Sequence, residues 1–148
     1  MLKLVEYDEA FLALSWLWLN DPEISKLTMT PPFTKEQQMS FYKSLAVRND
    51  YFIRGIIFNG EKIGVAGIKN ISHNKGEYWG YIGEKLYWGQ GLGKLVIQCI
   101  INEAQHLGLK KLYLHVNCNN ERAIKLYKRE GFDTIAVTNE IVLMDRWL

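Results

Sequence analysis

The chain has 148 residues, of which 48% are hydrophobic and 23% are charged. This length suits one domain with its own core, and the apolar content excludes an intrinsically disordered chain. The 18 Lys and Arg against 16 Asp and Glu leave a net charge of +2, which gives no electrostatic reason to expect nucleic-acid binding. Two cysteines make no disulfide framework, and no Cys/His cluster has metal-ligand spacing. We therefore expect a single domain over residues 1–148 and no metal.

An apolar run at residues 10–19 (AFLALSWLWL) resembles a signal peptide at first sight. The run is too short for a membrane span. Its flank carries Glu6, Asp8 and Glu9 in place of positive charge, and no small-residue cleavage site follows. We expect a buried helix in an untargeted, cytoplasmic protein that does not associate with membranes.

The first third of the chain predicts one strand and two helices, over residues 3–7, 8–20 and 34–48. Asp8 is a good N-cap for the first helix, and Asp21-Pro22 ends it. Thr34 and Gln37 form a capping-box pair at the start of the second helix. Residues 30–33, with two prolines, predict an irregular loop.

The rest of the chain predicts a meander, two long helices and a final hairpin. Asn59-Gly60 is a strong hairpin turn between the first two strands of the meander. Gly108 and Gly131 end the two helices. The predicted strands are 51–58, 62–71, 77–83, 111–116, 132–138 and 141–147, and the helices are 92–107 and 120–130. This order implies an α/β fold with a mixed, mainly antiparallel sheet flanked by helices.

The most informative segment is Tyr87–Lys94 (YWGQGLGK), between a strand and an apolar-faced helix. Its three glycines allow close backbone approach, and the N–H groups of the following helix would face an anion such as a pyrophosphate. The spacing G-x-G-x-G does not match a Rossmann fingerprint, and Gly93-Lys94 is followed by Leu95 where a Walker motif needs Ser or Thr. A glycine-rich turn without a ligand is the alternative.

At this segment the chain resembles the GNAT superfamily of N-acetyltransferases, whose pyrophosphate loop reads Arg/Gln-x-x-Gly-x-Gly/Ala. Gly91 and Gly93 match its two small positions, whereas Trp88 replaces the usual Arg or Gln. The family's second signature, Asn-x-x-Ala-x-x-Leu-Tyr-x-x-x-Gly-Phe, is matched at every fixed position, namely Asn120, Ala123, Leu126, Tyr127, Gly131 and Phe132. The resemblance covers essentially the whole chain and implies two central strands that splay apart.

The resemblance also implies acetyl-CoA as the cosubstrate and assigns residues to it. The pyrophosphate would be held by the backbone of Gly89, Gln90, Gly91, Leu92, Gly93 and Lys94. The pantetheine amides would pair with Ile82, Gly83 and Glu84. Asn117 and Asn120 would contact the cofactor at the mouth of the second splayed strand.

Two residues are candidates for catalysis. Tyr127 would protonate the departing thiolate, because a phenol with a pKa of ~10 keeps its proton at neutral pH. Its alternative role is core packing. Glu77 would act as a water-mediated base at the start of its strand, where the family often has a carboxylate. Relative to the family's commonest pattern it lies one residue early, which reverses the face of the side chain, and a bulge near Gly80 could restore that face. A solvated carboxylate is its alternative. His115 is expected to be structural or exposed, but it could face the cleft.

We expect direct transfer of an acetyl group to a primary amine of a small-molecule acceptor. The aromatic content of 13% and the compact N-terminal part favour a nucleotide-linked amino sugar. The alternatives are a protein N-terminus, as in ribosomal-protein acetyltransferases, a polyamine, or a non-catalytic acyl-CoA-binding module. The sequence leaves open whether the chain forms a homodimer.

Overall fold

A computed structural model describes all residues of the chain, 1–148. Seven strands form one sheet in the spatial order β1-β2-β3-β4-β5-β7-β6. All neighbours are antiparallel except β4 and β5, which are parallel. The predicted α/β class, with a mainly antiparallel sheet, is confirmed.

The elements are β1 Leu2–Glu6, α1 Glu9–Leu19, α2 Pro22–Thr28, α3 Lys35–Ser44, β2 Phe52–Phe58, β3 Glu61–Ser72, β4 Lys75–Ile82, the 3-10 helix η1 Lys85–Tyr87, α4 Leu92–His106, β5 Lys111–Asn117, α5 Glu121–Arg129, β6 Asp133–Thr138 and β7 Ile141–Trp147.

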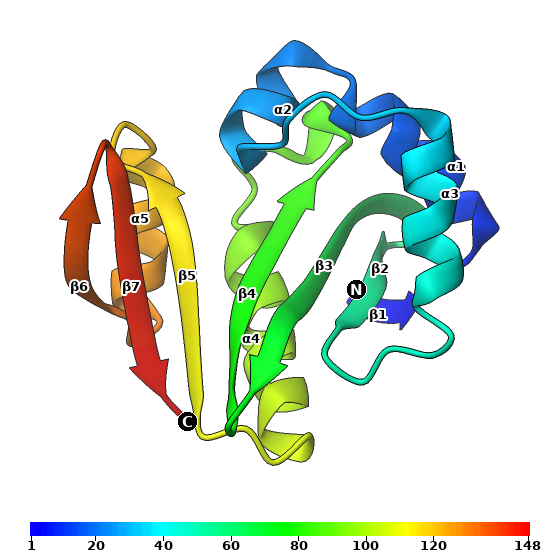
Figure 1. Ribbon diagram of the computed structural model, residues 1–148. Coiled ribbons are helices and arrows are strands. Elements are labelled where there is room, and N and C mark those ends of the chain that lie inside the picture. The colour runs from blue at the N-terminus through cyan, green and yellow to red at the C-terminus, as the bar shows by residue number, and fades with distance from the viewer.

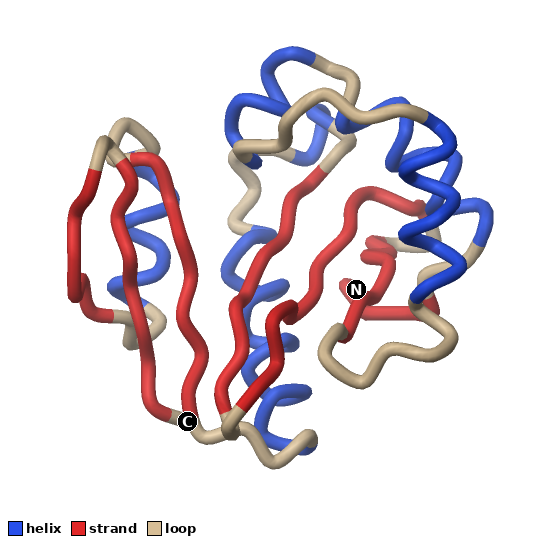
Figure 2. Tube along the Cα trace, in the orientation of Figure 1, coloured by secondary structure: helices blue, strands red, loops and turns tan.

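Helices cover both faces of the sheet (Figures 1 and 2). On one face, α4 buries an apolar stripe that includes Val96, Ile97 and Ile100 against the central strands, and α5 packs beside it. On the other face, Phe11 and Trp18 of α1 form a smaller core with β2 and β3. β3 and β4 therefore lie between α4 on one face and the N-terminal helices α1 and α2 on the other.

The two central strands part along their length. β4 and β5 pair only from Lys75 opposite Lys111 to Glu77 opposite Tyr113. Beyond this point β5 continues to pair with β7, and β4 with β3, so the sheet opens as a V (Figure 1). The splay that the family resemblance implies is therefore present, with Glu77 at its apex.

The prediction at Asp21-Pro22 missed a helix. Asp21-Pro22 was expected only to end α1, but it also begins α2. The Asp21 carboxylate accepts hydrogen bonds from the backbone N–H groups of Glu23 and Ile24, and Pro22 occupies the first helical position, where no N–H is needed. The same two residues therefore terminate one helix and cap the next. The helix that follows, α3, ends at Ser44 and not at Arg48.

The bulge near Gly80 that could have changed the face of Glu77 is absent, because the β3–β4 register is continuous from Ile82 down to Glu77. The irregularity lies instead in β3, between Lys69 and Ser72, where Asn70 adopts a φ of 52°. β4 begins at Lys75, two residues earlier than predicted, so Glu77 lies inside the strand and not at its start.

No helix of this fold is sufficiently long and apolar to pass through a membrane. No three His, Cys, Asp or Glu side chains gather as a metal site requires.

Candidate active site

A cleft of about 1010 Å³ occupies the splay and continues to the N-terminal helices. Four predicted site residues, Gly83, Glu84, Gln90 and Asn117, do not line it. The predicted residues that do line it are Glu77, Ile82, Gly89, Gly91, Leu92, Gly93, Lys94, Asn120 and Tyr127. The fold thus brings together predicted site residues that are up to 50 positions apart in the chain, from Glu77 to Tyr127.

The glycine-rich turn leads directly into α4. Gly91 is the N-cap of this helix, with a φ of 76° and no side-chain capping bond. A Cβ added to Gly91 would meet no atom within 4 Å, so open space lies in front of the backbone. The first N–H groups of a helix have no intrahelical partner, and the helix dipole adds positive potential there. The turn therefore presents free donors to an anion in the cleft.

Basic side chains also line the cleft, and one of them reaches the glycine-rich turn. Lys94, Arg122 and Arg129 all line the cleft, and none of them forms an ion pair with a carboxylate. The Arg122 Nη2 atom lies 3.6 Å from the position of a Cβ at Gly89. Backbone donors, a positive helix end and unpaired guanidinium groups together fit a pyrophosphate.

The residues at the end of β4 are hydrogen-bonded to other parts of the chain. The N–H groups of Gly83 and Glu84 both donate to the Ile63 carbonyl, at 2.6 and 3.2 Å. The Glu84 carboxylate accepts from Trp18 Nε1 at 3.2 Å, and the Ile82 carbonyl accepts from Trp88 Nε1 at 2.8 Å. Gly83 and Glu84 are thus tied to β3 and α1.

The alternation of antiparallel pairing identifies the open edge of β4. Since Gly83 bonds to Ile63, the hydrogen-bonded pairs with β3 fall on every second residue, and the backbone groups of Gly80 and Tyr78 point towards the splay. An extended ligand in the splay would meet these groups.

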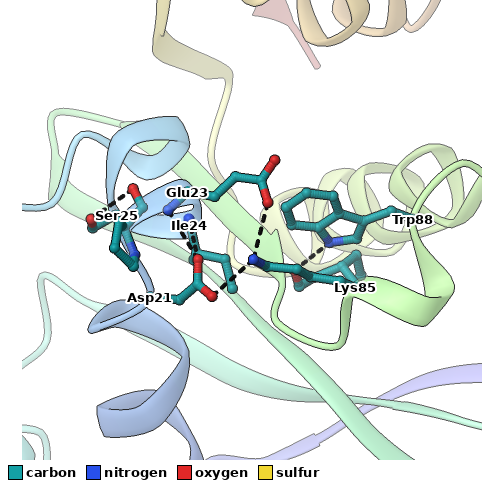
Figure 3. A network of polar contacts seen from close by, with 8 residues as sticks. Asp21, Glu23, Ile24, Ser25, Lys85 and Trp88 are labelled. Carbon is teal, nitrogen blue, oxygen red and sulfur yellow. Dashed lines mark hydrogen bonds and ion pairs between the residues drawn. The ribbon is translucent and has the colours of Figure 1, made fainter.

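A polar network ties the N-terminal helices to the start of the glycine-rich turn (Figure 3). Lys85 Nζ lies 2.8 Å from Asp21 Oδ2 and 3.0 Å from Glu23 Oε1, and 5.8 Å from the centre of the Trp88 ring. The two carboxylates hold the pKa of Lys85 above its usual range. Asp21 and Glu23 are therefore engaged with Lys85 and do not line the main cleft.

Tyr127 lies on α5, at the cleft wall, with its ring in edge contact with Tyr78 at 6.1 Å. Burial raises the pKa of Tyr127 to about 12. The phenol therefore keeps its proton at neutral pH and can donate it into the cleft.

Glu77 and His115 meet at the apex of the splay. Glu77 is 9% exposed. Its Oε2 lies 2.9 Å from His115 Nδ1, and its Oε1 accepts a 3.2 Å hydrogen bond from Asn70 Nδ2. His115 was expected to be structural or exposed, with a position facing the cleft as the alternative, and it lines the cleft. The sequence pattern that could have placed His115 in the cleft is the alternation of β5. His115 and Tyr113 share one face of this strand, and the buried Leu112 and Leu114 lie on the opposite face.

Aromatic side chains line the cleft on the face of β4 to which Glu77 belongs. Trp79 and Tyr81 stack at 6.5 Å between ring centres, and Tyr51 lies 6.1 Å from Trp79. Tyr7 donates a 3.0 Å hydrogen bond to the buried Ser15, which also lines the cleft. Desolvation raises the pKa of Tyr7, Tyr51 and Tyr81, so these phenols remain neutral hydrogen-bonding groups.

Several known proteins are similar to this chain in sequence or in fold. Residues 13–132 match the family model "Acetyltransferase (GNAT) family". The chain is 29% identical over 139 residues to the acetyltransferase PseH of Campylobacter jejuni, covering 89% of this chain and 85% of that protein. It is 27% identical to the uncharacterized protein MJ1062 of Methanocaldococcus jannaschii, covering 82% of this chain but 26% of that protein.

A solved structure agrees in fold. The spermidine N-acetyltransferase of Vibrio cholerae, in complex with CoA and spermine, superposes with a TM-score of 0.89 at 20% identity, over 99% of this chain and 95% of that one. The chain spans between 26% and 31% of the length of the first three curated relatives that it matches. Because the family model covers most of the chain, the chain belongs to the acetyltransferase (GNAT) family, a family of acetyl-CoA-dependent N-acetyltransferases.

Proposed function

We propose that this protein transfers an acetyl group directly from acetyl-CoA to a primary amine. The observation that carries this proposal is the cleft between the splayed strands, which joins the free helix terminus at Gly91 to Glu77 and Tyr127. The two catalytic candidates lie on opposite faces of β4, since Tyr127 contacts Tyr78 in the α4 core, whereas Glu77 shares the face of Trp79.

Acetyl-CoA would enter from the α4 side. The pyrophosphate binds to the first N–H groups of α4, and Arg122 supplies the positive charge that Trp88 does not. The pantetheine follows the open edge of β4 along Gly80, and the thioester reaches the apex of the splay. Asn120 caps α5 through its side chain, so its direct contribution to the cosubstrate is limited to the groups that this bond leaves free.

The chemistry uses groups on both sides of the thioester. The amine attacks the carbonyl carbon from the face of Glu77, and a backbone N–H near Ile82 stabilises the oxyanion. Tyr127 donates its proton to the departing thiolate. The proton of the acceptor ammonium is taken up in the polar cluster around Glu77.

The acceptor we propose is a nucleotide-linked amino sugar. Support comes from the aromatic side of the cleft, whose rings and phenol hydroxyls suit the apolar face and the hydroxyl groups of a sugar. A polyamine would require several carboxylates, and Glu77 is the one carboxylate on this side of the cleft. The likeness to the spermidine enzyme favours a polyamine as the second candidate.

Thiol release from acetyl-CoA tests the proposal. The purified chain is mixed with acetyl-CoA and, separately, a nucleotide-linked 4-amino sugar, spermidine or an alanine-terminated peptide, and the product is identified by mass spectrometry. We expect the fastest release, with a mono-acetylated product, from the amino sugar. Release with the polyamine or the peptide alone would reassign the acceptor. CoA binding without release in any mixture would favour a non-catalytic acyl-CoA-binding module.

A further inference from the structure

The pair formed by Glu77 and His115 lies where β4 and β5 part. Glu77 occupies the last β4–β5 pair, opposite Tyr113, and His115 follows two residues later on the same face of β5. The Glu77 side chain is 11% exposed and the His115 side chain 41% exposed. Both residues line the cleft. The carboxylate thus lies beneath the imidazole, and the imidazole is the more accessible of the two groups.

Hydrogen bonding assigns different roles to the two groups. Both Glu77 oxygens already have partners, Asn70 on Oε1 and His115 Nδ1 on Oε2. An ionised carboxylate can only accept, so His115 donates through Nδ1–H, and its neutral ring carries the lone pair on Nε2. Nε2 makes no hydrogen bond within the chain. The unoccupied proton acceptor at the apex is therefore His115 Nε2.

On the basis of the proposed function, we propose that His115 is the catalytic base, and that Glu77 and Asn70 are positioning residues. Glu77 holds the imidazole in the tautomer that exposes Nε2, and it stabilises the imidazolium that forms. This is the arrangement by which a buried carboxylate serves a histidine base in other enzymes. In this arrangement Glu77 keeps the hydrogen bonds that it already makes.

Protons and electrons balance across the proposed transfer. One proton of the acceptor ammonium moves to His115 Nε2, and the amine nitrogen forms a bond to the thioester carbonyl carbon. When the C–S bond breaks, its electron pair stays on sulfur, which takes the proton of Tyr127. The phenolate recovers a proton from the new amide nitrogen through water. His115 then releases its proton to solvent, and the products are the N-acetylated amine and CoA thiol.

Other titratable and charged groups surround the pair formed by Glu77 and His115. Lys69 Nζ is 4.0 Å from Glu77 Oε2, a weaker contact than the 2.9 Å bond to the imidazole. The Tyr113 ring lies edge-on to His115 at 6.1 Å, and its phenol pKa is raised, chiefly by desolvation and then by Glu77. The Tyr51 phenol, near Glu77, also has a raised pKa. Neither phenol is ionised at neutral pH. Glu77 and Lys69 are the charged groups near the imidazole from β4 and β3. On the same face of the sheet, β7 contributes Asp145, which is paired with Lys111 of β5 at 2.8 Å.

The experiment compares pH profiles of kcat/KM for the best acceptor among the amino sugar, spermidine and the peptide. The variants are His115→Gln, which retains a donor for Glu77 but no base, and Glu77→Gln. His73→Asn is the control, because His73 lies in the β3–β4 turn outside the cleft and its φ of 52° suits Asn. CoA affinity and circular dichroism report whether each variant is folded.

We expect His115→Gln to lose roughly 10²–10⁴-fold near neutral pH, with CoA affinity unchanged. Its residual rate should rise about tenfold per pH unit, as free amine accumulates, beyond the pH at which the parent levels off. Glu77→Gln should lose less of the rate, and the acid limb of its kcat/KM profile should move to lower pH. His73→Asn should have the same profile as the parent. An unchanged rate in His115→Gln, or a loss that is equal at every pH, would overturn the inference. A parent that acetylates none of the amines would refute the proposed function, and this inference with it.

Discussion

The indole Nε1 of Trp88 donates a 2.8 Å hydrogen bond to the carbonyl oxygen of Ile82, the last residue of β4. This bond fastens the glycine-rich turn to the end of the splayed strand. Trp88 occupies the position at which the resembled loop has Arg or Gln, so here the residue acts on the protein's own backbone. The charge that this position lacks is available from Arg122, which reaches the same turn from α5.

Replacing Trp88 by Phe keeps a ring and removes the N–H donor. We expect the free energy of unfolding to fall by about 0.5–1.5 kcal/mol, the usual net value of one hydrogen bond. CoA should bind more weakly because the turn loses its attachment. Urea denaturation and calorimetric titration with CoA measure the two effects. Trp147→Phe is the control, since Trp147 is 71% exposed, and an equal effect in both variants would exclude the attachment role.

Tyr127→Phe removes only the hydroxyl group of the proposed proton donor. We predict a loss in kcat of roughly 10²–10⁴-fold, with CoA affinity little changed. Steady-state kinetics with the best amine measures this loss. Tyr78→Phe is the matched comparison, because the two rings are in contact. If Tyr78→Phe lost the rate and Tyr127→Phe kept it, the proton donor would be Tyr78.

The raised pKa of Tyr127 predicts how stability depends on alkaline pH. The unfolded phenol titrates near pH ~10 and the native one near about 12. Below pH ~10 both states are protonated and the stability is complete. Above it the unfolded state loses its proton first, so unfolding becomes easier as the pH rises towards about 12. Urea midpoints across this window should fall in the parent and fall less steeply in Tyr127→Phe. Equal slopes would mean that Tyr127 titrates as it does in the unfolded chain.

Trp79→Leu should affect the acceptor and not the cosubstrate. Trp79 stacks with Tyr81 on the face of Glu77, away from the glycine-rich turn. Losing one aromatic contact, worth about 0.5–1.5 kcal/mol, should raise KM for the amino sugar about 2- to 12-fold. CoA affinity, measured by calorimetry, should stay the same. A weaker affinity for CoA with an unchanged acceptor KM would place the sugar elsewhere.

Much of the fold could be predicted because local signals and burial agree. The capping box of Thr34 with Gln37 and the hairpin at Asn59-Gly60 both form as expected. The helix α2 was not predicted, because the pattern Asp-Pro is typical both of the end of one helix and of the start of another. Only the packing of Ile24 into the core with Trp18 decides between them.

The site could be predicted less completely, because it depends on contacts between distant segments. The glycine-rich turn is a local pattern and was located from sequence. The bond between Glu77 and His115 spans 38 residues and follows from the strand order, which no local pattern reveals. The engagement of Gly83 and Glu84 with Ile63 likewise depends on how β3 and β4 are aligned.

Two glycines that flank α4 give the most direct test of the central claim, that the glycine-rich turn and the N-terminus of α4 hold acetyl-CoA. Gly91 precedes the helix and Gly108 follows it, with φ values of 76° and 79°, and a Cβ at either would meet no atom within 4 Å. Gly91→Val and Gly108→Val therefore impose the same backbone strain, but only Gly91 lines the cleft. The measurement is the CoA dissociation constant of both variants by calorimetry. We predict that CoA binding is lost in Gly91→Val and retained in Gly108→Val, whereas parent-like binding in a folded Gly91→Val would contradict the claim.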